Sequence, residues 1–105
     1  MVKTFNDIYK RRVRLTDERQ KHFVSDHPEM KGQIERVKLT LLNPEKIVRS
    51  RTDSHVELFY RHYESTPVTS KYLCVVVKTA KNNAFIITAY FTDKVKKGEV
   101  LWPRK

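Results

Sequence analysis

Four histidines are the side chains of this sequence best suited to moving a proton at neutral pH: His22, His27, His55 and His62. His22 belongs to a polar stretch, and His27 stands five residues later, at the break before Pro28. Placed across a helix end, these two can reach one groove and serve there as general base or acid. The alternative stays open that both are surface or capping histidines. His55, beside a turn, and His62, facing the core, are expected to be structural.

Arg61 and Thr88 are the next candidates, because each interrupts a run of another character. Arg61 lies among Phe59, Tyr60 and Tyr63, so its guanidinium can contact a phosphate or simply pack as a cation against the rings. Thr88 places a hydroxyl inside an apolar strand. A role in phosphate binding would explain it, and so would the ordinary β-propensity of threonine.

Other cationic and aromatic side chains are spaced along expected strands and can bind a polyanion. Bases stack on aromatic rings, and phosphates pair with guanidinium and ammonium groups. Each of these residues can equally belong to a solvated surface. The candidates for substrate binding are Lys71, Lys78, Tyr63, Tyr90, Arg49 and Arg51.

Several other chemistries are not supported. The His-x4-His spacing lacks the cysteine or acidic partners of a zinc site, so we predict no metal and no cofactor. With only two glycines, Gly32 and Gly98, no glycine-rich phosphate loop can form. No serine stands in a nucleophile-elbow motif, and the apolar segments hold no paired carboxylates.

Two helices are expected to come first. Thr16 is a suitable N-cap, with acids in the first turn, for a helix that runs to about Ser25. A second helix is predicted to open at Pro28, capped by Asp26 or His27, and to end at the Asn43-Pro44 pair. Its apolar stripe would be Met30, Ile34, Val37 and Leu41.

Four strands are expected to follow, at about 46–51, 55–63, 71–78 and 85–92. Their short connections predict antiparallel pairing. We therefore predict an α+β fold of two N-terminal helices packed on a four-stranded antiparallel sheet, as one domain over 1–105 with a flexible start at 1–12. Alternation predicts two faces for the last strand: Phe85, Ile87, Ala89 and Phe91 on one, and Ile86, Thr88, Tyr90 and Thr92 on the other. The face away from the helices is expected to carry Arg61, Tyr63, Thr88 and Tyr90.

Charge gives the strongest indication of a partner. The 105 residues carry 22 Lys and Arg against 12 Asp and Glu, a formal net charge of +10. Such an excess concentrates phosphate polymers at the surface, so RNA is the predicted partner. Cys74 stands alone in an apolar run, which fits a buried thiol in a reducing compartment. Without an apolar leader or a long apolar run, we expect a soluble cytoplasmic protein and no membrane partner.

Four motifs resemble a known group of nucleases. The segments "LTDERQKHFVSDHPEM", "LLNPEKIV", "KYLCVVVK" and "FIITAYFTDKVKKGEVLW" are similar to the phage-associated branch of the barnase–EndoU–colicin–RelE-like nuclease superfamily. The resemblance runs from about Val13 to Trp102. It implies helices followed by a four-stranded antiparallel sheet, and metal-independent RNA cleavage that leaves a cyclic phosphate. It also implies a toxin held by an antitoxin.

The resemblance further implies a site made of a helix-borne histidine, a strand-borne cation and a late hydroxyl. The matching positions are His22 or His27 as base, Arg61 neutralising the phosphorane, and Thr88 orienting the phosphate, with Lys71 as a further candidate. The leading hypothesis is thus a ribonuclease toxin with an acidic antitoxin as partner. Two alternatives remain: a non-catalytic RNA-binding module, and a protein-interaction domain whose charge serves solubility.

Overall fold

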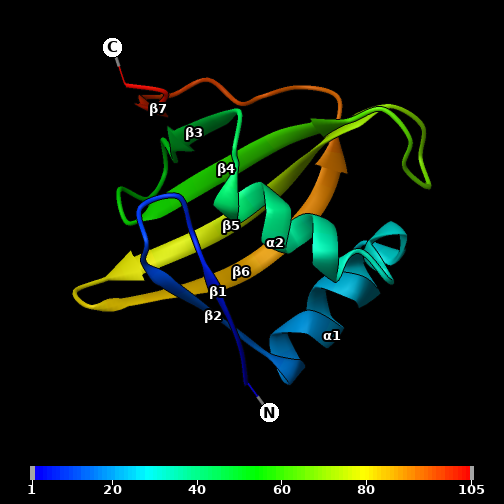
Figure 1. The fold of residues 1–105 in the computed structure, drawn as a ribbon, viewed down its shortest axis with the longest axis horizontal. Helices are drawn as coiled ribbons and strands as arrows, with labels where there is room; N and C mark the ends of the chain where they lie inside the picture. Colours follow the sequence, from blue (N-terminus) through cyan, green and yellow to red (C-terminus); the bar gives the residue numbers. More distant parts are fainter. Residues whose placement is uncertain (1, 105) are drawn as a thin grey trace.

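The computed structural model describes residues 2–104, which form one mixed β-sheet with both α-helices on the same face (Figure 1). In chain order the elements are β1 Val2–Asn6, β2 Arg12–Thr16, α1 Asp17–Asp26, the 3-10 turn η1 Pro28–Met30, α2 Ile34–Leu42, β3 Lys46–Arg49, β4 Val56–Tyr63, β5 Lys71–Ala80, β6 Asn83–Thr92 and β7 Val100–Trp102.

The sheet has seven strands in the order β1-β2-β6-β5-β4-β3-β7. The expected antiparallel meander is its centre, β3 to β6. The predicted four-stranded antiparallel sheet is nevertheless wrong. A β1–β2 hairpin joins β6 through a parallel pair, and β7 adds an edge strand on β3. These three strands have only three to five residues each, and their pairing depends on distant segments, so local patterning did not predict this sheet order.

The helices differ in how well their ends were predicted. Helix α1 begins as expected, with the Thr16 hydroxyl accepting the Arg19 N–H at 3.1 Å. The second helix does not begin at Pro28, because Pro28–Met30 is a separate 3-10 turn and α2 starts only at Ile34. Gly32 between them has a φ of 76°, a left-handed conformation that ends regular helix and that glycine adopts without strain.

Apolar side chains cover both faces of the central strands. On the helix side, Phe23, Val37 and Leu41 pack on Phe59 and Val75 in one continuous core. The other face carries a smaller cluster, which comprises Val48, Val56, Leu58, Tyr60 and Cys74. Because both faces are buried, the strands read as nearly continuous apolar runs.

A β-bulge in β6 decides which of its side chains face the helices. Val76 of β5 pairs with Thr88, whereas the next residue, Val77, pairs with Ile86. Ile87 is therefore an extra residue in β6, and the alternation changes phase across it. The predicted faces are consequently wrong for the first half of this strand and confirmed for the second half. Ala84, Ile86, Ala89 and Phe91 belong to the helix-side core, and Tyr90 and Ile87 pack on the opposite cluster.

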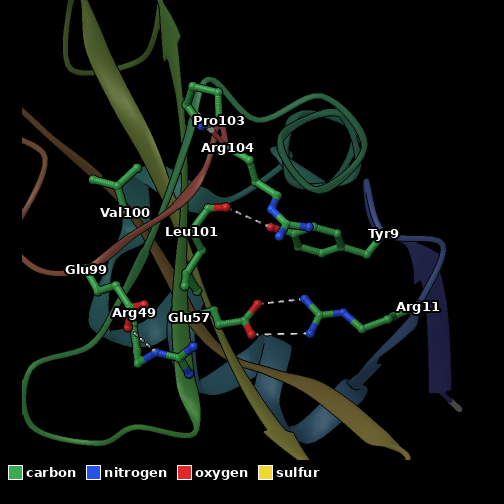
Figure 2. A pocket seen from close by; sticks show the side chains of 9 residues that line it. All are labelled: Tyr9, Arg11, Arg49, Glu57, Glu99, Val100, Leu101, Pro103 and Arg104. Atoms are coloured by element: carbon green, nitrogen blue, oxygen red, sulfur yellow. Dashed lines mark hydrogen bonds and ion pairs between the residues drawn. The ribbon is translucent and has the colours of Figure 1, made fainter.

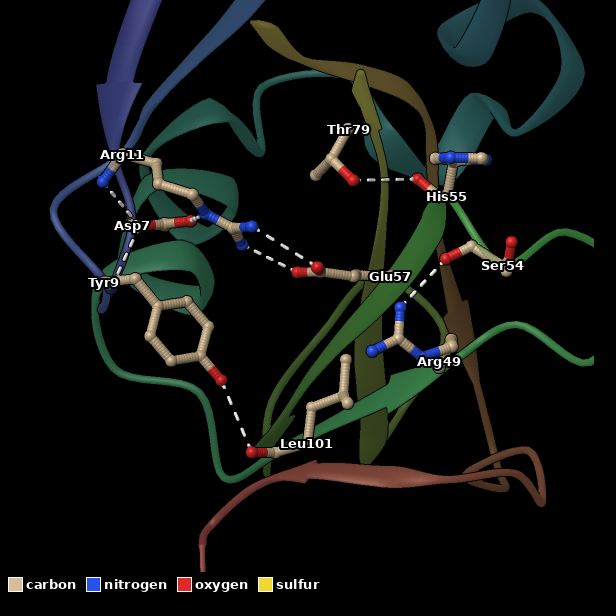
Figure 3. A network of polar contacts seen from close by, with 9 residues as sticks. All are labelled: Asp7, Tyr9, Arg11, Arg49, Ser54, His55, Glu57, Thr79 and Leu101. Carbon is tan, nitrogen blue, oxygen red and sulfur yellow. Dashed lines mark hydrogen bonds and ion pairs between the residues drawn. The ribbon is translucent and has the colours of Figure 1, made fainter. Parts of the chain in front are cut away.

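A buried ion-pair network fastens the β1–β2 hairpin to the sheet (Figure 3). Arg11 donates through Nε to Asp7 at 2.7 Å, and through Nη2 and Nη1 to the two carboxylate oxygens of Glu57 at 2.6 and 3.3 Å. Asp7 and Glu57 are only 2% and 8% exposed. The hairpin pairs with β6 at only two positions, so this guanidinium is a main tie between the hairpin and β4.

We expect Arg11→Ala to lower the free energy of unfolding by about 3 kcal/mol, because it leaves two buried carboxylates without their cation. Urea titration followed by circular dichroism measures the loss. The matched control is Arg12→Ala, an exposed neighbour on β2, which should change stability by less than about 0.5 kcal/mol. Equal losses in the two variants would contradict the role given to Arg11.

Candidate nucleic-acid interface

The sheet face away from the helices is hollowed into a groove of about 380 Å³, called here the sheet-face groove. Leu58, Val76 and Ile87 form its apolar floor on β4, β5 and β6. Its walls come from two connections. The first is the segment 50–53 after β3, and the second carries Lys96 and Lys97, which follow β6.

The second wall is held against the sheet by its backbone. The Lys96 N–H donates to the Tyr60 hydroxyl at 3.1 Å, and Val95 packs on the Tyr60 cluster. Gly98 then passes so close to β3 that a Cβ there would lie 2.6 Å from the Arg49 carbonyl oxygen. Only glycine fits at that approach. The hydrogen bond of Lys96 and the close contact of Gly98 therefore fix the backbone that carries Lys96 and Lys97 beside the groove.

The groove is positively charged. Arg51, Lys96 and Lys97 line it with exposed side chains. Asp53 is the one acid among its lining residues, and it is already engaged: it accepts the His55 N–H at 2.9 Å and pairs with Lys78 at 3.2 Å. The His55 N–H first, and then Lys78, lower the pKa of the Asp53 carboxyl. The arrangement leaves a surplus of cations facing the hollow, which suits a phosphate chain.

Thr88 and Tyr90 bring hydroxyl groups to the same groove from β6. Beyond Tyr90 stands His27, whose ring lies 5.3 Å from the Tyr90 ring, centroid to centroid, at an angle of 33°. His27 ends α1 by donating its backbone N–H to Phe23, and this fixes the base of its side chain. Its Nδ1 lies 3.9 Å from a Glu29 carboxylate oxygen. The His27 imidazole, at the C-cap of α1, thus adjoins the Tyr90 phenol, which lines the groove.

Beneath the groove, two tyrosine hydroxyls flank the buried thiol of Cys74. Burial raises the pKa of Cys74 to about 11, although hydrogen bonding to Tyr90 and Tyr60 and the charge of Lys96 act in the opposite sense. Burial likewise raises the pKa of Tyr60 and of Tyr90. All three groups therefore stay protonated at neutral pH, and the Tyr90 hydroxyl remains a hydrogen-bond donor.

Three of the residues selected from the sequence line this groove: Arg51, Thr88 and Tyr90. His27 and Lys78 lie outside the lining, where His27 packs beside Tyr90 and Lys78 pairs with Asp53. The expected common face with Arg61 and Tyr63 is wrong, because odd-numbered residues of β4 point to the helices. There Arg61 donates to the Asn43 carbonyl at 2.8 Å, and the Tyr63 hydroxyl donates to the Arg36 carbonyl at 3.1 Å.

The remaining candidates also lie elsewhere. His22 is largely exposed on α1, with Glu18 one turn away at 3.9 Å. Lys71 pairs with Asp93. Arg49 donates to Glu99 and to the Ser54 carbonyl at 2.9 Å each, outside the lining of the groove. That these side chains bind RNA stays a prediction.

Lys96 and Lys97 were missed as binding residues. Their signal was present as a basic run after the last strand, but such a run is normally solvated surface. Only the path of segment 93–99 across the sheet brings these lysines to Thr88 and Tyr90.

A second hollow lies between the hairpin loop and β7 (Figure 2). It measures about 650 Å³ and is called here the Arg11–Glu57 cleft. Tyr9 forms one wall, with the Arg11 guanidinium 4.9 Å from its ring centroid and its hydroxyl directed to the Leu101 carbonyl at 3.4 Å. Arg49 pairs with Glu99 at the opposite side.

Comparisons with family models, with curated proteins and with solved structures find no match for this chain. Within residues 2–104, no helix is long and apolar enough to cross a membrane. Over the same range, no three His, Cys, Asp or Glu side chains converge as a set of metal ligands.

Stability should fall at alkaline pH. The Cys74 thiol titrates near pH 11 when folded, against an ordinary value of 9.0, so the unfolded chain ionises first. The stabilisation is complete below pH 9 and is lost as pH rises toward 11, about 2 kcal/mol between pH 8 and 10.5 from this thiol alone. Urea titrations of wild type and Cys74→Ala test this. The variant should lose correspondingly less stability over that interval, and parallel curves would contradict the assignment.

Proposed function

We propose that this protein binds RNA in the sheet-face groove and cleaves it without a metal ion. The observation that carries the proposal is that Thr88 and Tyr90 line one hollow with the cations of Arg51, Lys96 and Lys97, while the His27 ring packs beside the Tyr90 ring. The net charge of +10 supports RNA as the polyanion. The apolar floor and the Tyr90 ring give bases a surface to pack on.

The residues of the groove suit transesterification by the 2′-hydroxyl. The His27 imidazole accepts the proton of that hydroxyl, whose oxygen attacks phosphorus. The bond to the 5′-oxygen then breaks, leaving a 2′,3′-cyclic phosphate. The departing oxygen takes its proton from an ammonium of the groove, Lys96 or Lys97. Tyr90, Thr88 and Arg51 donate hydrogen bonds to the phosphorane, whose charge develops in the transition state.

The nuclease-like motifs support this choice of groove over any other surface. "HPEM" contains His27, "KYLCVVVK" contains Val76 and Lys78, and "FIITAYFTDKVKKGEVLW" contains Thr88, Tyr90 and both groove lysines. The last two of these segments line the hollow, and His27 of the first packs beside Tyr90. In this reading Arg51 replaces Arg61 as the guanidinium that neutralises the phosphorane.

The same resemblance supports a toxin that an antitoxin holds inactive in the cytoplasm. An acidic segment laid in the sheet-face groove would match its charge and exclude RNA, and complementary charge makes such association fast. An RNA-binding module without cleavage would use the same groove, and an assay for cleavage separates the two.

We expect the purified protein to degrade RNA in excess EDTA and to leave cyclic phosphate ends. His27→Ala should lower the rate about 10²- to 10⁴-fold, the usual contribution of a general base. His22→Ala is the matched control on the same helix, and it should cleave within twofold of wild type. Gel analysis of a labelled RNA gives the rates, and circular dichroism confirms that the variants fold.

Intact RNA after long incubation at low salt would exclude cleavage and leave binding alone. Equal rates for wild type and His27→Ala would remove this imidazole from the mechanism. A selective loss in His22→Ala would place the site elsewhere on α1.

RNA binding should depend on the groove lysines. In a His27→Ala background, Lys96→Ala/Lys97→Ala should weaken binding of a single-stranded RNA about tenfold at low salt. It should also flatten the plot of log affinity against log salt by about 0.7 for each phosphate that the protein no longer neutralises. Lys21→Ala/Lys38→Ala removes the same charge from exposed helix positions and should leave the slope nearly unchanged. Fluorescence anisotropy at several salt concentrations measures both, and an equal weakening by the two double variants would show only a net-charge effect.

A further inference from the structure

We infer that the Arg11–Glu57 cleft is a nucleobase pocket that selects guanine, an inference that rests on RNA binding in the sheet-face groove. The cleft is the larger of the two hollows, about 650 against 380 Å³, and a flat heterocycle fits within it. Its walls combine an aromatic ring, Tyr9 at 40% exposure, with the apolar side chains of Leu101 and Pro103.

The charge of the cleft argues against a phosphate as its ligand. Arg11 is committed to Asp7 and Glu57, and Arg49 to Glu99, so in the part of the chain that the structure describes Arg104 is the one guanidinium lining the cleft without an acidic partner. An anion would meet a single uncompensated cation there, whereas the sheet-face groove has a larger surplus of cations. A neutral ligand with several donors and acceptors suits the cleft better.

The hydrogen-bonding groups left over define that ligand. Within residues 2–104, the Nη2 of Arg49, the second carboxylate oxygen of Glu99 and the guanidinium of Arg104 have no hydrogen-bond partner. Guanine presents two neighbouring N–H groups to a carboxylate, and its O6 and N7 accept from a guanidinium. Adenine lacks the paired donors, and the pyrimidines lack the N7 acceptor.

The position of the cleft allows one RNA strand to occupy both hollows. Arg49 lines the cleft, and Arg51, two residues on, lines the groove. Two residues span at most about 7 Å. A base beside the groove can therefore turn over the β3–β7 edge into the cleft while its phosphate stays with the cations of the groove.

The test compares two 2′-O-methyl dodecamers, which cannot be cleaved by 2′-oxygen attack: a uridine homopolymer, and the same chain with one central guanosine. Fluorescence anisotropy at fixed salt should show the guanosine oligomer binding wild type at least fivefold more tightly. Glu99→Gln puts an amide donor against the guanine donors, and should reduce the preference to below twofold without weakening binding of the homopolymer. Arg104→Ala should reduce the preference in the same way.

Glu64→Gln is the matched control, since it makes the same charge change on an exposed loop outside the cleft; the preference should remain. Equal binding of both oligomers by wild type would overturn the guanine pocket and leave RNA binding intact. A preference that survives Glu99→Gln and Arg104→Ala would overturn it too. Arg104→Ala weakening both oligomers equally would mark a phosphate site instead. Failure of wild type to bind either oligomer would refute the proposed function itself.

Discussion

The bulge at Ile87 is the constraint on which both faces of this sheet depend. One extra residue in β6 sends Ala84, Ile86, Ala89 and Phe91 to the helices and Thr88 and Tyr90 to the groove. In a strand without a bulge, side chains alternate between the two faces along its whole length. Either the first half or the second half of β6 would then direct its apolar side chains away from the helices. Bulges commonly redirect side chains beside functional sites, and here the redirected pair are hydroxyls.

The groove itself is completed by chain that has no regular structure. Segment 93–99 leaves β6, crosses the Tyr60–Cys74 cluster and reaches the β3 edge, where β7 pairs. A hydrogen bond from Lys96 to Tyr60 and the tight approach of Gly98 fix that path. The flexible side chains of Lys96 and Lys97 therefore extend from a fixed backbone. Their charges lie beside the hollow, and ligand binding would not have to order the backbone.

The two hollows differ in electrostatics as well as in size. Among the residues that line the groove, three are cations and the one acid, Asp53, is already paired with Lys78. Such a surplus of cations favours phosphate, and the proposed binding would be sensitive to salt. In the Arg11–Glu57 cleft, Glu57 pairs with Arg11 and Glu99 pairs with Arg49. The Arg11 network also stabilises the fold, because it connects the hairpin to β4 (Figure 3). One arginine thereby links the stability of the N-terminal hairpin to the shape of a potential ligand site.

The sequence alone determined the local elements and the strong positive charge. The Thr16 cap and the period-two runs of β3 to β6 are properties of neighbouring residues, and they predicted α1 and the meander. The excess of lysine and arginine is a property of composition, and the proposal of a polyanion partner rests on it. Tertiary structure decided what depends on distant segments: the parallel β2–β6 pair, the β7 edge, the bulge, and the separation of Arg61 from Thr88. Those features have no local signal, because a two-residue pairing, a one-residue register shift or a three-residue strand is stabilised only by the surface on which it packs.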